Sequence, residues 1–138
     1  MALAGRAGIL IDTNLLVLFV VGRVNRARIE TFKRTRQYTL ADYNLLVWAL
    51  AQFTVVYTVP HILAEVSNLT DLAGFEGFHA RRILRQERLG LVDAVIGEAA
   101  RAHHCGVLTD DFALYQLLSR ESVSVVSFSQ LRARAGIL

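Results

Sequence analysis

Short runs of β-branched and apolar residues alternate with longer segments of helical spacing along this chain. The strand-like runs are GILIDT at 8–13, FTVVYTVP at 53–60, GVLTDD at 106–111 and SVSVVSF at 122–128. Strands that are separated by helices pair in parallel, and parallel sheets are covered by helices on both faces. The alternation therefore predicts an α/β fold with a central, largely parallel four-stranded sheet.

The segments between these runs predict the helices. They cover 14–21, ending at Gly22, then a basic segment at 25–36, then 40–52, a helix after Pro60 that carries Glu65, 71–88, 91–104, 111–120 and a terminal helix from Ser129. No internal repeat, low-complexity segment or linker interrupts this pattern. A chain of 138 residues fits one domain, so we expect a single domain over 1–138.

Composition limits the class of protein. A hydrophobic fraction of 54% with a single proline excludes a disordered chain. The longest uncharged apolar stretch, 45–59, is shorter than the roughly 20 residues that span a bilayer. The N-terminus does not resemble a secretion signal, and one cysteine, Cys105, cannot form an internal disulfide. We therefore expect a cytoplasmic protein with no membrane segment.

Carboxylates stand where the predicted strands end. Asp12 closes the run at 8–13, Asp110 and Asp111 close the run at 106–111, and Glu65 and Asp93 lie on predicted helices that could bring them to the same edge. Two carboxylates about 4 Å apart repel by roughly 4 kcal/mol at an effective dielectric constant of 20, so such a cluster predicts bound cations. Oxygen ligands without a His or Cys cage favour Mg²⁺ or Mn²⁺ over zinc.

Each acid also has a simpler explanation. Asp12 and Asp93 could cap helices, and Glu65 could be an exposed helix residue. At most one of the adjacent Asp110 and Asp111 need bind a metal, because the other can cap the following helix.

Other chemistries have weaker support. The HHC run at 103–105 has no matching second cluster for zinc, and no glycine-rich phosphate loop or G-x-G-x-x-G is present. Enzymes similar to haloacid dehalogenases need a second Asp where this chain has Asn14, and receiver domains need a late lysine, whereas the only lysine is Lys33.

Arginine dominates the positive charge, because only Lys33 among the 15 basic residues is a lysine. Basic residues cluster at 23–36 and at 81–88. Arginine suits phosphate and carboxylate partners, so these clusters are candidates for binding nucleic acid or an acidic protein segment. The alternative is a solvated helix face. The candidate side chains are Arg26, Arg34, Arg81, Arg82 and Arg85.

Four segments, ILIDTNLL, VPHILAEVSNL, GLVDAVIGEAA and VLTDDFALY, resemble in this order the acidic motifs of the PIN domain. The PIN domain is the metal-dependent nuclease fold of VapC-type toxins in bacterial toxin–antitoxin pairs, and the resemblance covers about 8–128. It implies a three-layer α/β/α sandwich. It also implies catalytic and metal-binding acids at Asp12, Glu65, Asp93 and, with the family's Thr-x-Asp pattern aligned on Thr109, Asp111. The supporting polar residues are Asn14, Thr109 and Asp110.

The function that this resemblance implies is a Mg²⁺- or Mn²⁺-dependent endoribonuclease, the toxin of a type II toxin–antitoxin pair. Its implied partners are an RNA substrate, a cognate antitoxin and a second copy in a homodimer. The alternative is a PIN-like scaffold that binds RNA or protein through a catalytically weak site. All four acidic positions are filled, which favours the nuclease.

Overall fold

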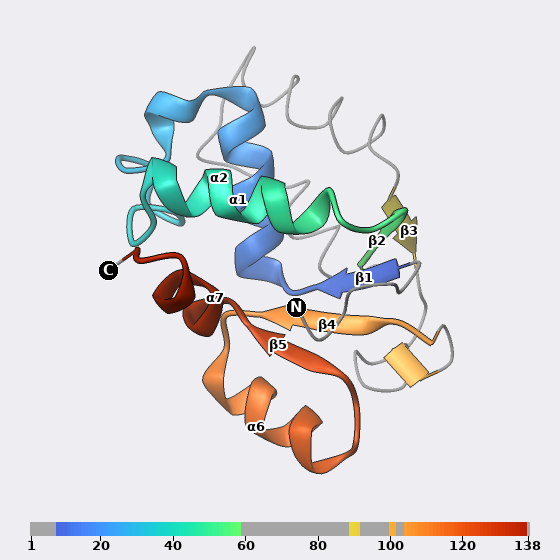
Figure 1. Ribbon diagram of the computed structural model, residues 1–138. Coiled ribbons are helices and arrows are strands. Elements are labelled where there is room, and N and C mark those ends of the chain that lie inside the picture. Colours follow the sequence, from blue (N-terminus) through green and yellow to red (C-terminus); the bar gives the residue numbers. More distant parts are fainter. Residues whose placement is uncertain (1–7, 59–88, 92–99, 102–103, 138) are drawn as a thin grey trace.

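The computed structural model describes residues 8–58, 89–91, 100–101 and 104–137 (Figure 1). Its centre is a sheet with strand order β3-β2-β1-β4-β5, in which every neighbouring pair is parallel. The strands are β1 Gly8–Ile11, β2 Val55–Thr58, β3 Leu89–Leu91, β4 Gly106–Thr109 and β5 Val125–Ser127. The predicted α/β class and parallel sheet are confirmed.

Each of the four predicted runs contains one of these strands, and β3 adds a fifth. We expected a helix to begin at Leu91, whereas β3 spans Leu89–Leu91 and pairs with β2. Three residues, LGL, are too few to show the period of a strand, so this strand has no clear signal in the sequence.

The strand β1 lies at the centre of the sheet and is buried along its whole length. A near-continuous apolar run is typical of a strand covered on both faces. Ile11 is paired with Leu108 of β4, so Asp12, which follows β1, lies beside Thr109, the last residue of β4, at the carboxyl edge of the sheet. This register positions the candidate site.

Helices lie on both sides of this sheet. They are α1 Thr13–Val24, α2 Leu40–Leu50, α6 Phe112–Arg120 and α7 Phe128–Arg134. Figure 1 shows α1 and α2 together above β1, and α6 beside β4 and β5. This arrangement is consistent with a three-layer sandwich. Among the described residues, no helix is both long and apolar enough to cross a membrane.

Two of the predictions for the first 36 residues differ from the structure. The first helix runs past Gly22 to Val24, and a Cβ at Gly22 would collide with the ring of Tyr43, so this glycine lets α1 and α2 approach closely. The prediction of a helix at 25–36 is wrong. That segment contains a 3₁₀ turn, η1 Arg26–Arg28, followed by further turns.

The sequence of this segment explains the difference. The Asn25 side chain accepts from the N–H of Ala27 at 3.0 Å, which ends α1 and starts the turn. Ile29, Phe32 and Thr35 are buried, and the Thr35 hydroxyl donates to the carbonyl of Ile29 at 2.7 Å. The segment therefore folds around its own buried side chains.

The helices predicted at 40–52, at 111–120 and from Ser129 are confirmed as α2, α6 and α7, with bounds that differ by one or two residues. Three other predicted helices lie wholly or mostly outside the described residues. This applies to the helix after Pro60, to 71–88 and to most of 91–104, of which Ala100 and Arg101 are helical.

Candidate functional site

Asp12 is the central carboxylate of the candidate site. It is 7% exposed and caps the N-terminus of α1, where its Oδ1 accepts from the N–H of Leu15 at 3.2 Å. Its Oδ2 accepts from the hydroxyl of Thr109 and from the N–H of Asp110 at 3.0 Å. The carboxylate is thus held by donors from α1 and from the end of β4.

These three hydrogen bonds compensate only in part for the loss of hydration of the Asp12 carboxylate on burial. Burial raises the pKa of Asp12 above its usual range, hydrogen bonds from Thr109, Asp110 and Leu15 act in the opposite direction, and the charge of Asp110 raises it further. The net shift is upward, so the ionised carboxylate is not fully stabilised by the protein's own groups. A cation beside Asp12 would favour the ionised form.

Thr109 connects the ends of β1 and β4. It is fully buried, its hydroxyl donates to Asp12, and the same oxygen accepts from the N–H of Asp111 at 3.0 Å. A valine would have the same shape but neither bond. The hydroxyl therefore fixes the turn after β4 relative to Asp12.

Asp110 and Asp111 have different surroundings. Asp110 is half-buried, and its oxygens accept from the hydroxyl of Tyr38 at 2.5 Å and from the hydroxyl of Ser129 at 3.2 Å. Asp111 is exposed and caps α6 by accepting from the N–H of Leu114 at 3.0 Å. Of the two, Asp111 has the capping role, and Asp110 is the acid whose charge acts on Asp12.

Sequence reasoning missed Tyr38 as a site residue. Its side chain is 1% exposed, and its ring meets that of Phe128 edge-on, with centroids 6.3 Å apart. Burial and the hydrogen bond to Asp110 raise the pKa of its hydroxyl. The capping-box pattern of Thr39 and Asp42 marks the start of a helix directly after Tyr38, but no sequence signal indicates the contact of Tyr38 with Asp110.

The other predicted site residues are distributed as follows. Asn14 is exposed in the first turn of α1, Arg26 is exposed with its guanidinium 5.7 Å from the ring centre of Tyr43, and Arg34 is half-buried. Outside the described residues lie Glu65, Asp93, Arg81, Arg82 and Arg85. Within the described part of the chain, no three His, Cys, Asp or Glu side chains form a group that could hold a metal ion.

No protein-family model, curated protein or solved structure matches this chain.

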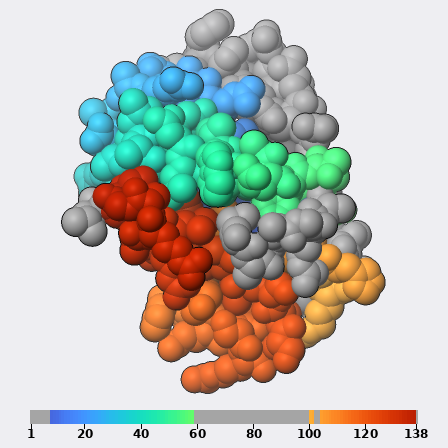
Figure 2. All heavy atoms as spheres, viewed as in Figure 1, coloured from blue at the N-terminus to red at the C-terminus, as the bar shows by residue number. Residues whose placement is uncertain are grey.

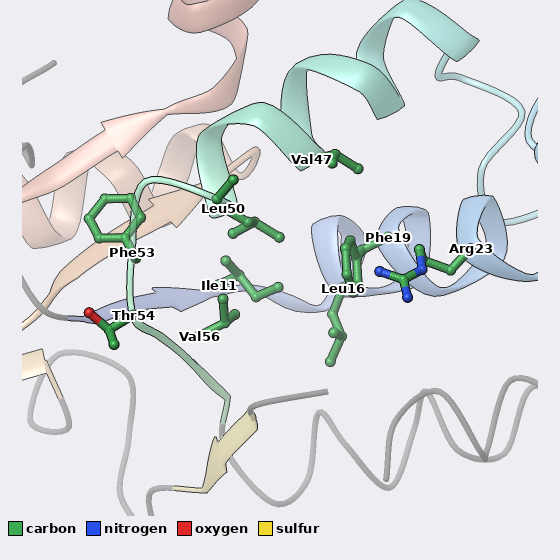
Figure 3. Close-up of a pocket in the computed structure, with 10 residues that line it drawn as sticks. Ile11, Leu16, Phe19, Arg23, Val47, Leu50, Phe53, Thr54 and Val56 are labelled. Atoms are coloured by element: carbon green, nitrogen blue, oxygen red, sulfur yellow. The ribbon is translucent and has the colours of Figure 1, made fainter. Parts of the chain in front are cut away.

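A separate apolar pocket lies between α1 and α2, above β1 and β2 (Figure 3). Its volume is about 270 Å³, and Ile11 and Leu50 point toward one another across it. Arg23 supplies the charged group among its lining residues, which include no carboxylate. The pocket and the acidic edge are therefore chemically distinct.

Proposed function

We propose that this chain is a Mg²⁺- or Mn²⁺-dependent endoribonuclease with a PIN-like fold. The observation that carries this proposal is the environment of Asp12, a buried carboxylate at the carboxyl edge of a parallel sheet whose pKa is raised despite three hydrogen-bond donors. The resemblance of the four acidic segments to PIN motifs supports the same function.

The donor chemistry fits a hard divalent cation, because the side chains beside Asp12 offer oxygen. A carboxylate has about four acceptor positions. Three of those of Asp12 are filled by Leu15, Thr109 and Asp110, which leaves one on Oδ1. Asp110 contributes the second carboxylate of the described site, and Glu65 and Asp93 complete the proposed set.

When bound, a divalent cation supplies charge neutralisation and a lowered pKa of water for phosphodiester hydrolysis. Thr109 and the N–H of Asp110 hold Asp12 in one orientation, so its charge is fixed before substrate arrives. Arg26 and Arg34 lie on the segment that leads to Tyr38, which donates to Asp110 at this edge. They could contact phosphates that flank the cleaved bond.

Metal-stimulated cleavage of a panel of structured RNAs tests the proposal. The parent should cleave with Mg²⁺ or Mn²⁺ and not with EDTA, and Asp12→Asn should lose about a hundredfold or more, as expected for a residue that binds the metal. RNA binding without cleavage would instead favour the scaffold.

A comparison of Asp110→Asn with Asp111→Asn separates the two adjacent acids. The geometry of the site predicts the larger loss for Asp110→Asn, because Asn caps a helix nearly as well as Asp. A larger loss for Asp111→Asn would favour the Thr-x-Asp alignment on Thr109 instead.

We also propose the toxin role, with an antitoxin as the protein partner and a homodimer as the assembly. Induced expression of the parent should arrest growth, and Asp12→Asn should relieve the arrest. A neighbouring reading frame that encodes a small protein with a DNA-binding segment should supply protection. Light scattering of the purified protein measures the assembly directly.

A further inference from the structure

Two hydroxyl groups from different parts of the chain hold the carboxylate of Asp110. Tyr38 donates to its Oδ2 at 2.5 Å, and Ser129, in the first turn of α7, donates to its Oδ1 at 3.2 Å. We propose that Tyr38 is a positioning residue, which fixes the Asp110 carboxylate beside Asp12 for cation binding. Because Asp110 acts through the proposed metal site, this role rests on the proposed function.

The Tyr38 hydroxyl is itself held in place. The ring of Tyr38 is almost completely buried and meets Phe128 edge-on, and the backbone N–H of Tyr38 donates to the carbonyl of Thr35 at 2.8 Å. The next residue, Thr39, caps α2, whose Asp42 carboxylate lies 2.6 Å from Nε of Arg132 on α7. The backbone on both sides of Tyr38 is therefore anchored, and its hydroxyl has little freedom to leave Asp110.

The repulsion between Asp12 and Asp110 explains why a positioning group is needed. The N–H of Asp110 donates to Asp12 at 3.0 Å, so the two residues are adjacent, and two ionised carboxylates this near repel each other. Tyr38 and Ser129 each take one acceptor position on a different oxygen, which leaves positions on both oxygens for a cation. A neutral donor fixes the carboxylate without neutralising it, whereas a lysine or arginine would compete with a cation.

Calorimetric titration of the metal-free protein with Mn²⁺ tests this role without relying on RNA cleavage. Tyr38→Phe keeps the buried ring and removes the hydroxyl, and we expect the Kd for Mn²⁺ to rise about tenfold or more, as for other groups that orient metal ligands. Ser129→Ala should raise it in the same direction, and since Ser129 is exposed, this variant leaves the core intact. The matched control is Tyr115→Phe on α6, which should bind Mn²⁺ like the parent.

The outcomes distinguish the two proposals. A parent that binds neither Mn²⁺ nor Mg²⁺ would overturn the proposed function, and the role of Tyr38 with it. A parent that binds Mn²⁺ while Tyr38→Phe and Ser129→Ala bind it equally well would overturn the role of Tyr38 alone.

A double-mutant comparison separates positioning from general support of the fold. In an Asp110→Asn background the group that Tyr38 orients is already altered, so adding Tyr38→Phe should cause no further rise in the Kd. A further rise comparable with that in the parent would show that Tyr38 acts through the fold and not through Asp110.

Discussion

At the scale of single residues, burial of Asp12 couples its ionisation to folding. Its raised pKa means that the metal-free native state binds the Asp12 proton more tightly than the unfolded chain does. In the unfolded chain the pKa of this carboxyl is near 3.8. The free energy of unfolding should therefore fall as the pH rises from about 3.8 through the native pKa of Asp12. Above the native pKa it should fall no further. Asp12→Asn removes the effect.

Denaturant unfolding of both proteins in EDTA, over the acidic range up to neutral pH, measures this contribution. The unfolding free energy of Asp12→Asn relative to the parent should increase with pH and then level off. The amide side chain of Asp12→Asn cannot accept the N–H of Asp110 at this position, so the variant also loses stability at every pH. The test is therefore the sign of the change in relative stability with pH. A relative stability that decreases with pH would contradict the raised pKa.

Thr109 and Thr58 provide a matched pair, because each is the last residue of a parallel strand and each is fully buried. Thr109 bonds to Asp12 and Asp111, whereas the Thr58 hydroxyl has no hydrogen-bond partner among the described residues. Thr109→Val should cost about 1–3 kcal/mol, because it leaves buried groups unsatisfied, and Thr58→Val should be near neutral or stabilising. Equal losses in thermal or urea unfolding would contradict this difference.

At the scale of elements, the ion pair between Asp42 and Arg132 joins α2 to α7, which lie side by side in Figure 2. The Asp42 side chain is fully buried, whereas that of Arg132 is 25% exposed. Arg132→Met leaves a buried carboxylate without its partner and should cost about 3–5 kcal/mol. Asp42→Asn leaves a guanidinium that still reaches water, so its cost should be smaller. Urea unfolding measures both losses of stability. A larger loss for Asp42→Asn than for Arg132→Met would contradict this prediction.

Much of the sheet could be predicted, because the strands at 8–11, 55–58, 106–109 and 125–127 are compact β-branched or apolar runs. The segment at 25–36 could not be predicted, because Ile29 and Phe32 have helical spacing, whereas turns bury their side chains. Asp12 and Thr109 could be predicted as neighbours, because Asp12 follows β1 and Thr109 ends the strand β4 that pairs with it. Tyr38 could not, since its contact with Asp110 spans 72 positions and follows no periodicity.

At the scale of the whole molecule, charge is unevenly distributed. The net charge is +3, yet residues 23–36 contain six basic side chains and one acid, Glu30. In Figure 2 this segment lies on the same face as α2 and α7. A local excess of this kind attracts phosphates more strongly than the net charge suggests.

RNA affinity measured against salt concentration tests this distribution. Arg26→Gln with Arg34→Gln should weaken binding and reduce the slope of log K against log salt by about 1.4, since each lost contact with a single strand contributes about 0.7. Arg120→Gln with Arg134→Gln makes the same change in net charge on α6 and α7. An equal reduction in this control pair would assign the effect to net charge and contradict a role for the segment.

The hydrogen bond between Thr109 and Asp12 also determines the earliest stage of protein synthesis at which the site can form. The two residues are 97 positions apart in the chain. A ribosome that adds about 5–20 residues per second needs roughly 5–20 s to make the second residue after the first. Throughout that interval the nascent chain carries Asp12 without the hydroxyl that orients it. The acidic edge is therefore assembled late in synthesis, after most of the chain has left the ribosome's catalytic centre.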